Sequence, residues 1–200
     1  MARTTAGFYP RGTISGREYP AIWEFIIANS QTITIGDLVR VNTSGYVARV
    51  TAASNQAIGV CTGIVDRNGI SVFSDRAIGL DGVTSKTESG ITVSSTNQSN
   101  DQRNIKVQVM LDSTGDILWF NDANADLTQS NLLQSGQLGT YTSGLQTVGV
   151  STLNDTMDIG LEIQLIKRDP DGDADASKGL WRITNTQLFI DQTENSHILA

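Results

Sequence analysis

Few residues in this chain combine a type and a spacing that could support catalysis. The one histidine, His197, lies near the C-terminal end of the sequence, where a frayed backbone would hold an imidazole poorly against a substrate. The sequence has no serine-centred nucleophile elbow, no phosphate-binding loop ending in Gly-Lys-Ser or Gly-Lys-Thr, no HExxH pair and no CxxC pair. We therefore expect no catalytic residues and no enzymatic activity.

One enzymatic alternative is a small all-β hydrolase that cleaves a glycosidic bond with two carboxylic acids. The 21 aspartates and glutamates supply candidate pairs. Such enzymes usually line their clefts with aromatic side chains, and this chain offers three tryptophans, Trp23, Trp119 and Trp181. This small number weighs against a glycosidase.

The densest group of acidic residues follows the segment 157–165, in which apolar residues occupy every second position. Its four aspartates are Asp169, Asp171, Asp173 and Asp175. Alternating carboxylates can converge their oxygens on calcium, a hard cation that takes six to eight oxygen ligands. The EF-hand spacing is not kept, because Gly172 comes early and Leu180 stands at the twelfth position. The segment is therefore either a calcium loop or a solvated acidic turn. No other metal or cofactor site is expected.

Charge and hydropathy narrow the range of partners. The formal net charge is −7, whereas a nucleic-acid binder needs a basic face that displaces counterions from phosphates. No run approaches the ~20 apolar residues of a membrane span, and the first residues lack the apolar core of a signal peptide. We therefore expect no nucleic-acid partner, no membrane partner and synthesis in a cytoplasm. Cys61 lies in an apolar run, which predicts a buried thiol.

The elements that would position any site are predicted to be strands. Hydrophobic residues make up 38% of the chain and aromatic residues 6%, with 19 glycines, which suits short strands joined by polar turns. In the segment 32–65, Val39 and Val41 alternate with Leu38 and Arg40, as a half-buried strand requires. We expect a mainly β fold of antiparallel barrel or sandwich units.

Two successive β units are predicted. The first, barrel-like unit covers 31–115 and includes a polar loop over 83–104, and the second covers 116–191 and is followed by a tail over 192–200. At most one short helix is expected, and its best place is within 122–137.

The first thirty residues differ from the rest of the chain. They contain two of the three prolines, Pro10 and Pro20, which favour extended backbone. We interpret 1–30 as an extended N-terminal arm whose aromatic residues contact a partner. Packing of these residues on their own barrel is the alternative. The predicted interface residues are Phe8, Tyr9, Trp23 and Phe25.

Three stretches in order resemble the capsid decoration (cement) proteins of tailed bacteriophages. The first comprises Gly36-Asp37-Leu38-Val39-Arg40-Val41, Gly45-Tyr46-Val47 and Ala57-Ile58-Gly59-Val60; the second is 104–149; the third joins 161–169 to 179–187. The resemblance spans about three quarters of the chain and is weakest over 1–30 and 83–104. Thr186 departs from the family pattern, which often has a histidine there.

The resemblance implies a structural virion protein without catalytic residues. Such a head-stabilising protein binds the outer surface of the expanded capsid, contacts the major capsid protein and stabilises contacts between its subunits. By analogy with the family we expect a homo-oligomer, with a homotrimer preferred, located in the virion after synthesis in the host cytoplasm. The alternative is a tail or receptor-binding β module that recognises host surface glycans.

Overall fold

The computed structural model describes residues 7–51, 56–72, 82–87, 90–99, 104–112, 114–140, 146–155, 162–168 and 177–184. These residues form fifteen strands and three short 3-10 turns, without an α-helix in the described ranges. All strand pairs within the sheets are antiparallel. The prediction of a mainly β fold with antiparallel units is confirmed.

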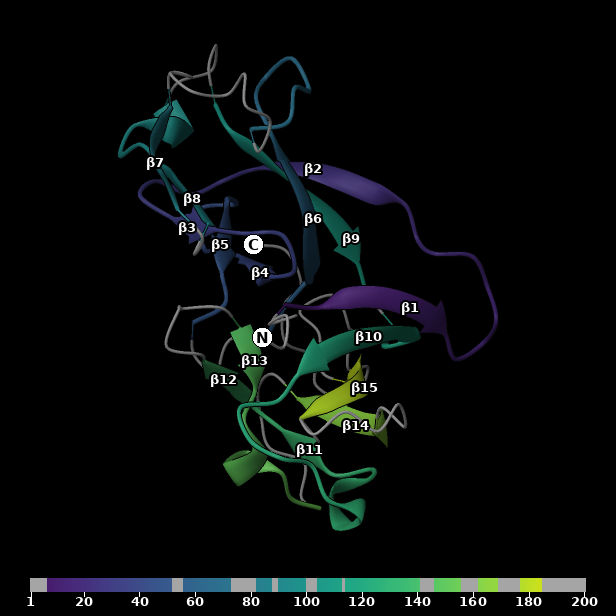
Figure 1. The fold of residues 1–200 in the computed structure, drawn as a ribbon. Coiled ribbons are helices and arrows are strands. Elements are labelled where there is room, and N and C mark those ends of the chain that lie inside the picture. The colour runs from purple at the N-terminus through teal and green to yellow at the C-terminus, as the bar shows by residue number, and fades with distance from the viewer. Residues whose placement is uncertain are drawn as a thin grey trace.

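The strands form two halves, one above the other in Figure 1. The first half has a five-stranded sheet in the order β2 (Ile22–Ile26), β9 (Lys106–Leu111), β6 (Gly59–Val65), β4 (Leu38–Val41) and β5 (Val47–Arg49). A smaller sheet joins β3 (Thr32–Ile33), β8 (Gly90–Val93) and β7 (Val83–Thr87). The predicted polar loop over 83–104 therefore contains a hairpin of two strands.

The second half has its own five-stranded sheet and a two-stranded one. The larger sheet has the order β1 (Tyr9–Thr13), β10 (Ile117–Asp122), β15 (Lys178–Ile183), β14 (Ile163–Arg168) and β11 (Ser135–Gly136). The smaller joins β12 (Leu138–Thr140) to β13 (Gln146–Val148). The 3-10 turns are η2 (Asn97–Ser99), η3 (Gln129–Asn131) and η4 (Val150–Thr152).

Two clusters of buried side chains form the interior. The upper core lies within the first half and consists of Ile27, Ile33, Val39, Val47, Ile58, Cys61, Ile64, Val72, Ile91, Val93, Ile105, Val107 and Val109. The shared core draws on both halves and consists of Phe8, Leu38, Val50, Ala57, Val60, Met110, Ile117, Trp119, Ala123, Leu127, Val148, Ile163, Leu165, Trp181 and Ile183. The large sheet of the first half therefore has buried residues on both faces.

This double burial changes the meaning of the alternation in β4. Val39 faces the upper core, and Leu38 on the opposite face is also fully buried, because it packs in the shared core. The same holds in β9, where Val109 faces the upper core and Met110 the shared core. The pattern predicted a half-exposed strand, whereas the second half covers its other face.

The large sheet of the first half curls towards closure without becoming a closed barrel. Its first and last strands approach where Ile27 forms a bridge with Val47. The N–H of Ala28 donates to Val47 O at 2.7 Å. Beyond this point β2 diverges from β5, and no strand of the described ranges lies beside its N-terminal portion.

The segment predicted to hold a short helix contains only the 3-10 turn η3. A capping box between Thr128 and Asn131 starts this turn. Leu133 then adopts a positive φ of 64°, and its N–H donates to Leu165 O at 2.8 Å. The chain is thus drawn into pairing with β14 before a helix can develop.

A buried glutamine connects the two halves. Gln146, at the start of β13, accepts a hydrogen bond from the N–H of Leu38 at 2.6 Å and donates its amide to Val50 O at 2.6 Å. Leu38 and Val50 are themselves joined by one backbone bond, from Val50 N–H to Leu38 O at 2.9 Å. An antiparallel pair of this kind would normally have a second backbone bond, from Leu38 N–H to Val50 O. The glutamine amide takes the place of that bond, where β4 begins and β5 ends.

A second amide extends this connection into the sheet of the second half. Asn121, in β10, is fully buried and donates to Gln146 O at 3.3 Å. Its side-chain oxygen accepts from the N–H of Gly7 at 2.9 Å, and its backbone oxygen accepts from the indole of Trp181 at 3.0 Å. Polar groups that would otherwise be unpaired in the interior thus bond one another across the junction.

The N-terminal segment is extended, as predicted, and it belongs to both halves. β1 pairs with β10 in the second half, and β2 pairs with β9 in the first half. In its described portion this segment is therefore an edge strand of each large sheet, joined by the connector 14–21, which arches away from the body in Figure 1.

Candidate functional site

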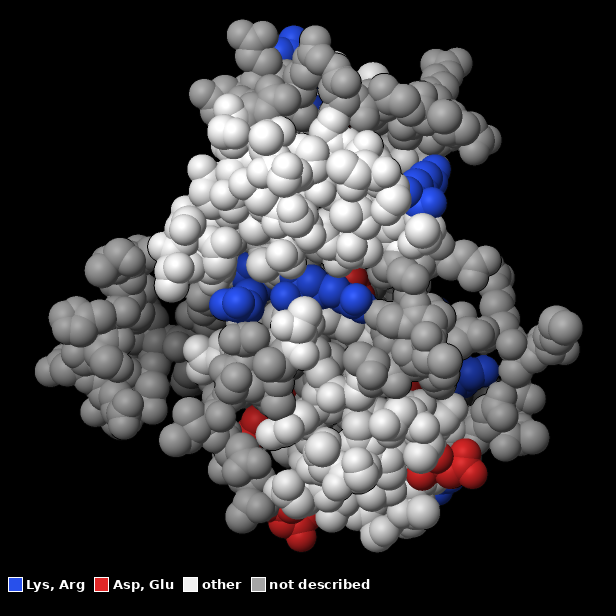
Figure 2. Space-filling model, turned by 90° about the vertical axis from the view of Figure 1, so that its left-hand side faces the viewer, with Lys and Arg blue, Asp and Glu red and all other residues white. Residues whose placement is uncertain are grey.

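The charged side chains leave much of one face neutral. Figure 2 shows that uncharged residues cover most of the described surface there, and that basic side chains meet in a row at the waist between the two halves. Acidic side chains are scattered, mainly over the second half. The candidate binding surface is therefore formed by exposed apolar groups and not by charged ones.

Exposed large apolar residues are concentrated on the N-terminal segment. Among the described residues, seven such side chains are exposed, and five of them precede residue 24. We call these five the N-terminal strip: Tyr9, Ile14, Tyr19, Ile22 and Trp23. The other two, Ile70 and Leu133, lie apart in the sequence. Every residue from 14 to 24 is exposed, so the strip is an extended surface.

The connector within the strip is fixed at its β1 end by hydrogen bonds to Asp116. The N–H of Ile14 donates to Asp116 O at 2.8 Å, and the N–H of Ser15 donates to the Asp116 carboxylate at 2.9 Å. The Ser15 hydroxyl bonds the same carboxylate, and these bonds lower the pKa of Asp116. The connector is thus an ordered loop that displays its side chains in a defined way.

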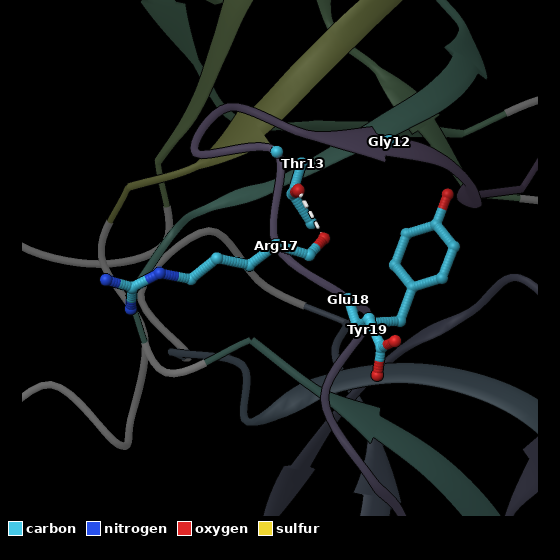
Figure 3. A pocket seen from close by; sticks show the side chains of 6 residues that line it. Gly12, Thr13, Arg17, Glu18 and Tyr19 are labelled. Carbon is cyan, nitrogen blue, oxygen red and sulfur yellow. Dashed lines mark hydrogen bonds between the residues drawn. The ribbon is translucent and has the colours of Figure 1, made fainter.

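A hollow of about 470 Å³ lies against this connector. Its lining residues are Gly12, Thr13, Gly16, Arg17, Glu18 and Tyr19. The Thr13 hydroxyl donates to Arg17 O at 2.7 Å, and Figure 3 shows the Tyr19 ring and the Arg17 guanidinium extending in opposite directions. The hollow is open and lined by one segment, so it suits a side chain of a partner better than an enclosed small molecule.

The four predicted interface residues differ in the solvent exposure of their side chains. Phe8 is only 1% exposed and packs in the shared core, so its side chain offers no docking surface. Phe25 is half-buried against the upper core. Tyr9 and Trp23 are exposed, and the indole of Trp23 is exposed to 58%. Local packing, the alternative raised from sequence, therefore describes the two phenylalanines.

Sequence reasoning missed three members of the strip: Ile14, Tyr19 and Ile22. In an alternating strand, Ile22 and Trp23 point to opposite faces, and a sequence pattern assigns only one of them to the surface. Both are exposed because β2 is the edge strand of its sheet. The uninterrupted stretch of turn-forming and polar residues between β1 and β2 was the available signal for Ile14 and Tyr19.

The remaining sequence candidates are the four aspartates of the candidate calcium loop, His197 and Cys61. The aspartates of the candidate calcium loop, Asp169, Asp171, Asp173 and Asp175, and His197 lie outside the described residues. In the described ranges, histidine, cysteine, aspartate and glutamate form no group of three or more that could hold a metal ion. Cys61 is a free, fully buried thiol, as predicted, and burial raises its pKa. The described portion also holds no helix with the length and apolar character of a membrane span.

A buried ion pair supports the turn that precedes β4. Asp37 is fully buried, and its carboxylate lies 2.9 Å from Arg49 Nε and 3.0 Å from a terminal guanidinium nitrogen. It also accepts from the N–H of Thr34 at 2.9 Å. Burial raises the pKa of Asp37 to about 6, against the lowering effect of Arg49. At neutral pH the pair is therefore ionised.

This pair gives a measurable pH dependence. Because the folded state holds the Asp37 proton more tightly than the unfolded chain, the contribution of Asp37 to the free energy of unfolding is greatest below pH ~4 and falls as the pH rises to about 6. We expect the stability difference between the wild type and Asp37→Asn to change by about 1–3 kcal/mol across this window. Urea unfolding at several pH values measures it, and parallel profiles for the two proteins would contradict the assignment.

Comparison with models of protein families, with curated proteins and with solved structures found no match to this chain.

Proposed function

We propose that this chain is a capsid decoration protein of a tailed bacteriophage. It binds the outer surface of the expanded capsid and stabilises contacts between subunits of the major capsid protein. The order of the three resembling segments in the sequence suggests this function. The single structural observation that supports it is the N-terminal strip, an exposed apolar surface on a β body.

The strip has the composition of a binding surface. Tyrosine and tryptophan are enriched among the residues that contribute most to protein–protein affinity. Exposed apolar residues scattered singly need no explanation, but a grouped set marks an interaction site. Because the segment forms part of both large sheets, a partner that binds it contacts a surface anchored in each half.

Stabilisation of a shell follows from differential binding. A protein that docks only where neighbouring subunits adopt their expanded arrangement stabilises that arrangement by the difference in its affinity for the two states. Many copies bound to one particle make modest affinity at each site sufficient. By analogy with the family, the protein binds as a homotrimer and resides in the virion.

The proposal is tested with purified expanded heads that lack this protein. The wild type is expected to bind and to raise the resistance of the heads to heat and osmotic shock. The double variant Ile22→Ala/Trp23→Ala is expected to bind at least about tenfold more weakly, because loss of a buried aromatic anchor costs about 2 kcal/mol or more. Leu133→Ala, which removes an exposed apolar residue elsewhere, is the matched control and is expected to bind normally.

Co-sedimentation with the heads measures binding, and survival after heating measures stabilisation. Heads that remain equally resistant with and without the bound protein would overturn the proposed function. Equal binding of the double variant and the wild type would place the docking surface elsewhere.

The second candidate is a tail or receptor-binding module that recognises host glycans. Its support is the exposure of Tyr19 beside the open hollow, since aromatic rings stack on sugar faces in many binding sites. A glycan-array signal lost in Tyr19→Ala would favour it. Copy number separates the two, because hundreds of copies per particle fit decoration and a dozen or fewer fit a tail.

A further inference from the structure

The edge of β2 differs from the other sheet edges in this protein. Its register with β9 is continuous from Ile22 to Ile26, without a bulge. β2 contains no proline and no lysine. Natural proteins usually protect free edges with such features, because unpaired backbone groups attract other strands.

The two longest other edges show this protection. β1 contains Pro10, which has no N–H to donate, and its register with β10 shifts between Pro10 and Gly12. In β7 the register with β8 shifts between Val83 and Ser85, and the strand is polar and includes Lys86. By contrast, β2 exposes Ile22 and Trp23, to 52% and 58%.

The register shows which backbone groups of β2 are available. Ile27 N–H donates to Ile105 O at 3.1 Å, and hydrogen-bonded pairs alternate along an antiparallel ladder. The backbone groups of Trp23 and Phe25 therefore face β9, whereas those of Ile22, Glu24 and Ile26 face outwards. At Ile26 this outer edge reaches the bridge between Ile27 and Val47, so β5 lies beside it there. Beside Ile22 and Glu24 the described part of the chain places no strand. On the same outer edge, Ala28 is already paired with Val47, so this edge accepts a strand where one is present.

We propose that the outer edge of β2 binds an extended segment of another polypeptide, which adds a strand to the sheet. Its backbone would bond Ile22 and Glu24, and its apolar side chains would cover Ile22 on one face and Trp23 on the other. Binding by strand addition takes its affinity from main-chain bonds and its specificity from alternate side chains.

Charge identifies the kind of segment. Glu24 is 40% exposed and lies 3.6 Å from Lys106, and it accepts from the Gln108 amide at 3.2 Å. A lysine or arginine opposite Glu24 on an added strand gives a favourable cross-strand pair. A second copy fits poorly, because antiparallel pairing centred on Glu24 opposes two carboxylates and each copy has a net charge of −7. The inference does not depend on the capsid proposal, because it concerns this edge and not the identity of the assembly.

The test uses the full chain and a soluble peptide of about ten residues that alternates threonine and valine around a central lysine, with both ends blocked. Binding is expected at millimolar affinity or better, with slower hydrogen exchange at the amides of Ile22 and Glu24. A matched peptide with glutamate in place of the lysine is expected to bind about two- to fivefold more weakly.

Two changes that block strand pairing test the inference further, one in the protein and one in the peptide. Glu24→Pro removes an outward N–H without removing a bond to β9, and it is expected to abolish binding, whereas Glu24→Gln retains it. If Glu24→Pro does not fold, a peptide N-methylated at alternate residues blocks pairing from the other side and is expected not to bind. Failure of the lysine peptide to bind, binding that survives either block, or protection at another edge would overturn the inference. Dimerisation of the wild type that Glu24→Pro removes would assign the edge to a second copy and would likewise overturn it.

Discussion

Replacing Trp119 with alanine is expected to lower the free energy of unfolding by about 4–6 kcal/mol. Trp119 is completely buried in the shared core, so its removal leaves a cavity the size of an indole. Its indole N–H also donates to the carboxylate of Asp112 at 2.8 Å, and Asp112 is itself buried. The variant therefore loses packing and leaves a buried carboxylate without this donor.

Urea unfolding followed by circular dichroism measures this loss. Trp23→Ala is the matched control, because it removes the same side chain from an exposed position, and it is expected to change stability by less than about 1 kcal/mol. Trp119→Phe keeps much of the volume and removes the donor, so it is expected to fall between the two. Similar losses for Trp119→Ala and Trp23→Ala would contradict the described burial.

Replacing Gln146 with alanine is expected to lower the free energy of unfolding by about 2–4 kcal/mol. The substitution leaves the N–H of Leu38 and the carbonyl of Val50 without the amide that bonds both. Each buried backbone group without a partner costs about 1–3 kcal/mol. The effect is larger than that of an ordinary polar-to-alanine change because two groups in the other half are affected.

Thermal and urea unfolding check this prediction, with Gln129→Ala as control. Gln129 is exposed in η3, and its replacement is expected to be nearly neutral. A Gln146→Ala protein as stable as the control would show that water or a shifted backbone satisfies the two groups.

The sequence predicted the strands best where the chain follows a simple alternation. Val107 and Val109 alternate with Lys106 and Gln108, and β9 forms there with the valines in the upper core. The alternation did not show that Met110 is buried as well, because the covering residues belong to the second half. A period-two pattern describes one strand and carries no information about a second layer.

The polar junction was beyond sequence reasoning. Gln146 and Asn121 are ordinary polar residues in the sequence, and no local pattern distinguishes a buried amide from an exposed one. Their roles arise from pairing between residues about a hundred positions apart, such as Gln146 with Leu38. Only the folded arrangement brings these groups together.

The candidate surface was predicted in part. Aromatic residues and prolines in the first thirty positions indicated an extended segment with exposed rings, and Tyr9 and Trp23 agree with that expectation. Phe8 departs from it because its N–H donates to Gly36 O and its ring lies in the shared core. The sequence does not distinguish neighbouring aromatic residues such as Phe8 and Tyr9. Which of them is buried depends on how the strand packs against the core.

The position of β1 and β2 in the chain also constrains the order in which the protein folds. Both strands precede their partners by a long stretch of chain, because Tyr9 pairs with Phe120 and Ile22 pairs with Met110. Neither large sheet can be completed until these later strands have been translated, and contacts between such distant segments form slowly because chain entropy is lost before they are gained. Completion of both sheets therefore comes late in folding, and the exposed residues of β2 have to be kept from unwanted pairing during that interval.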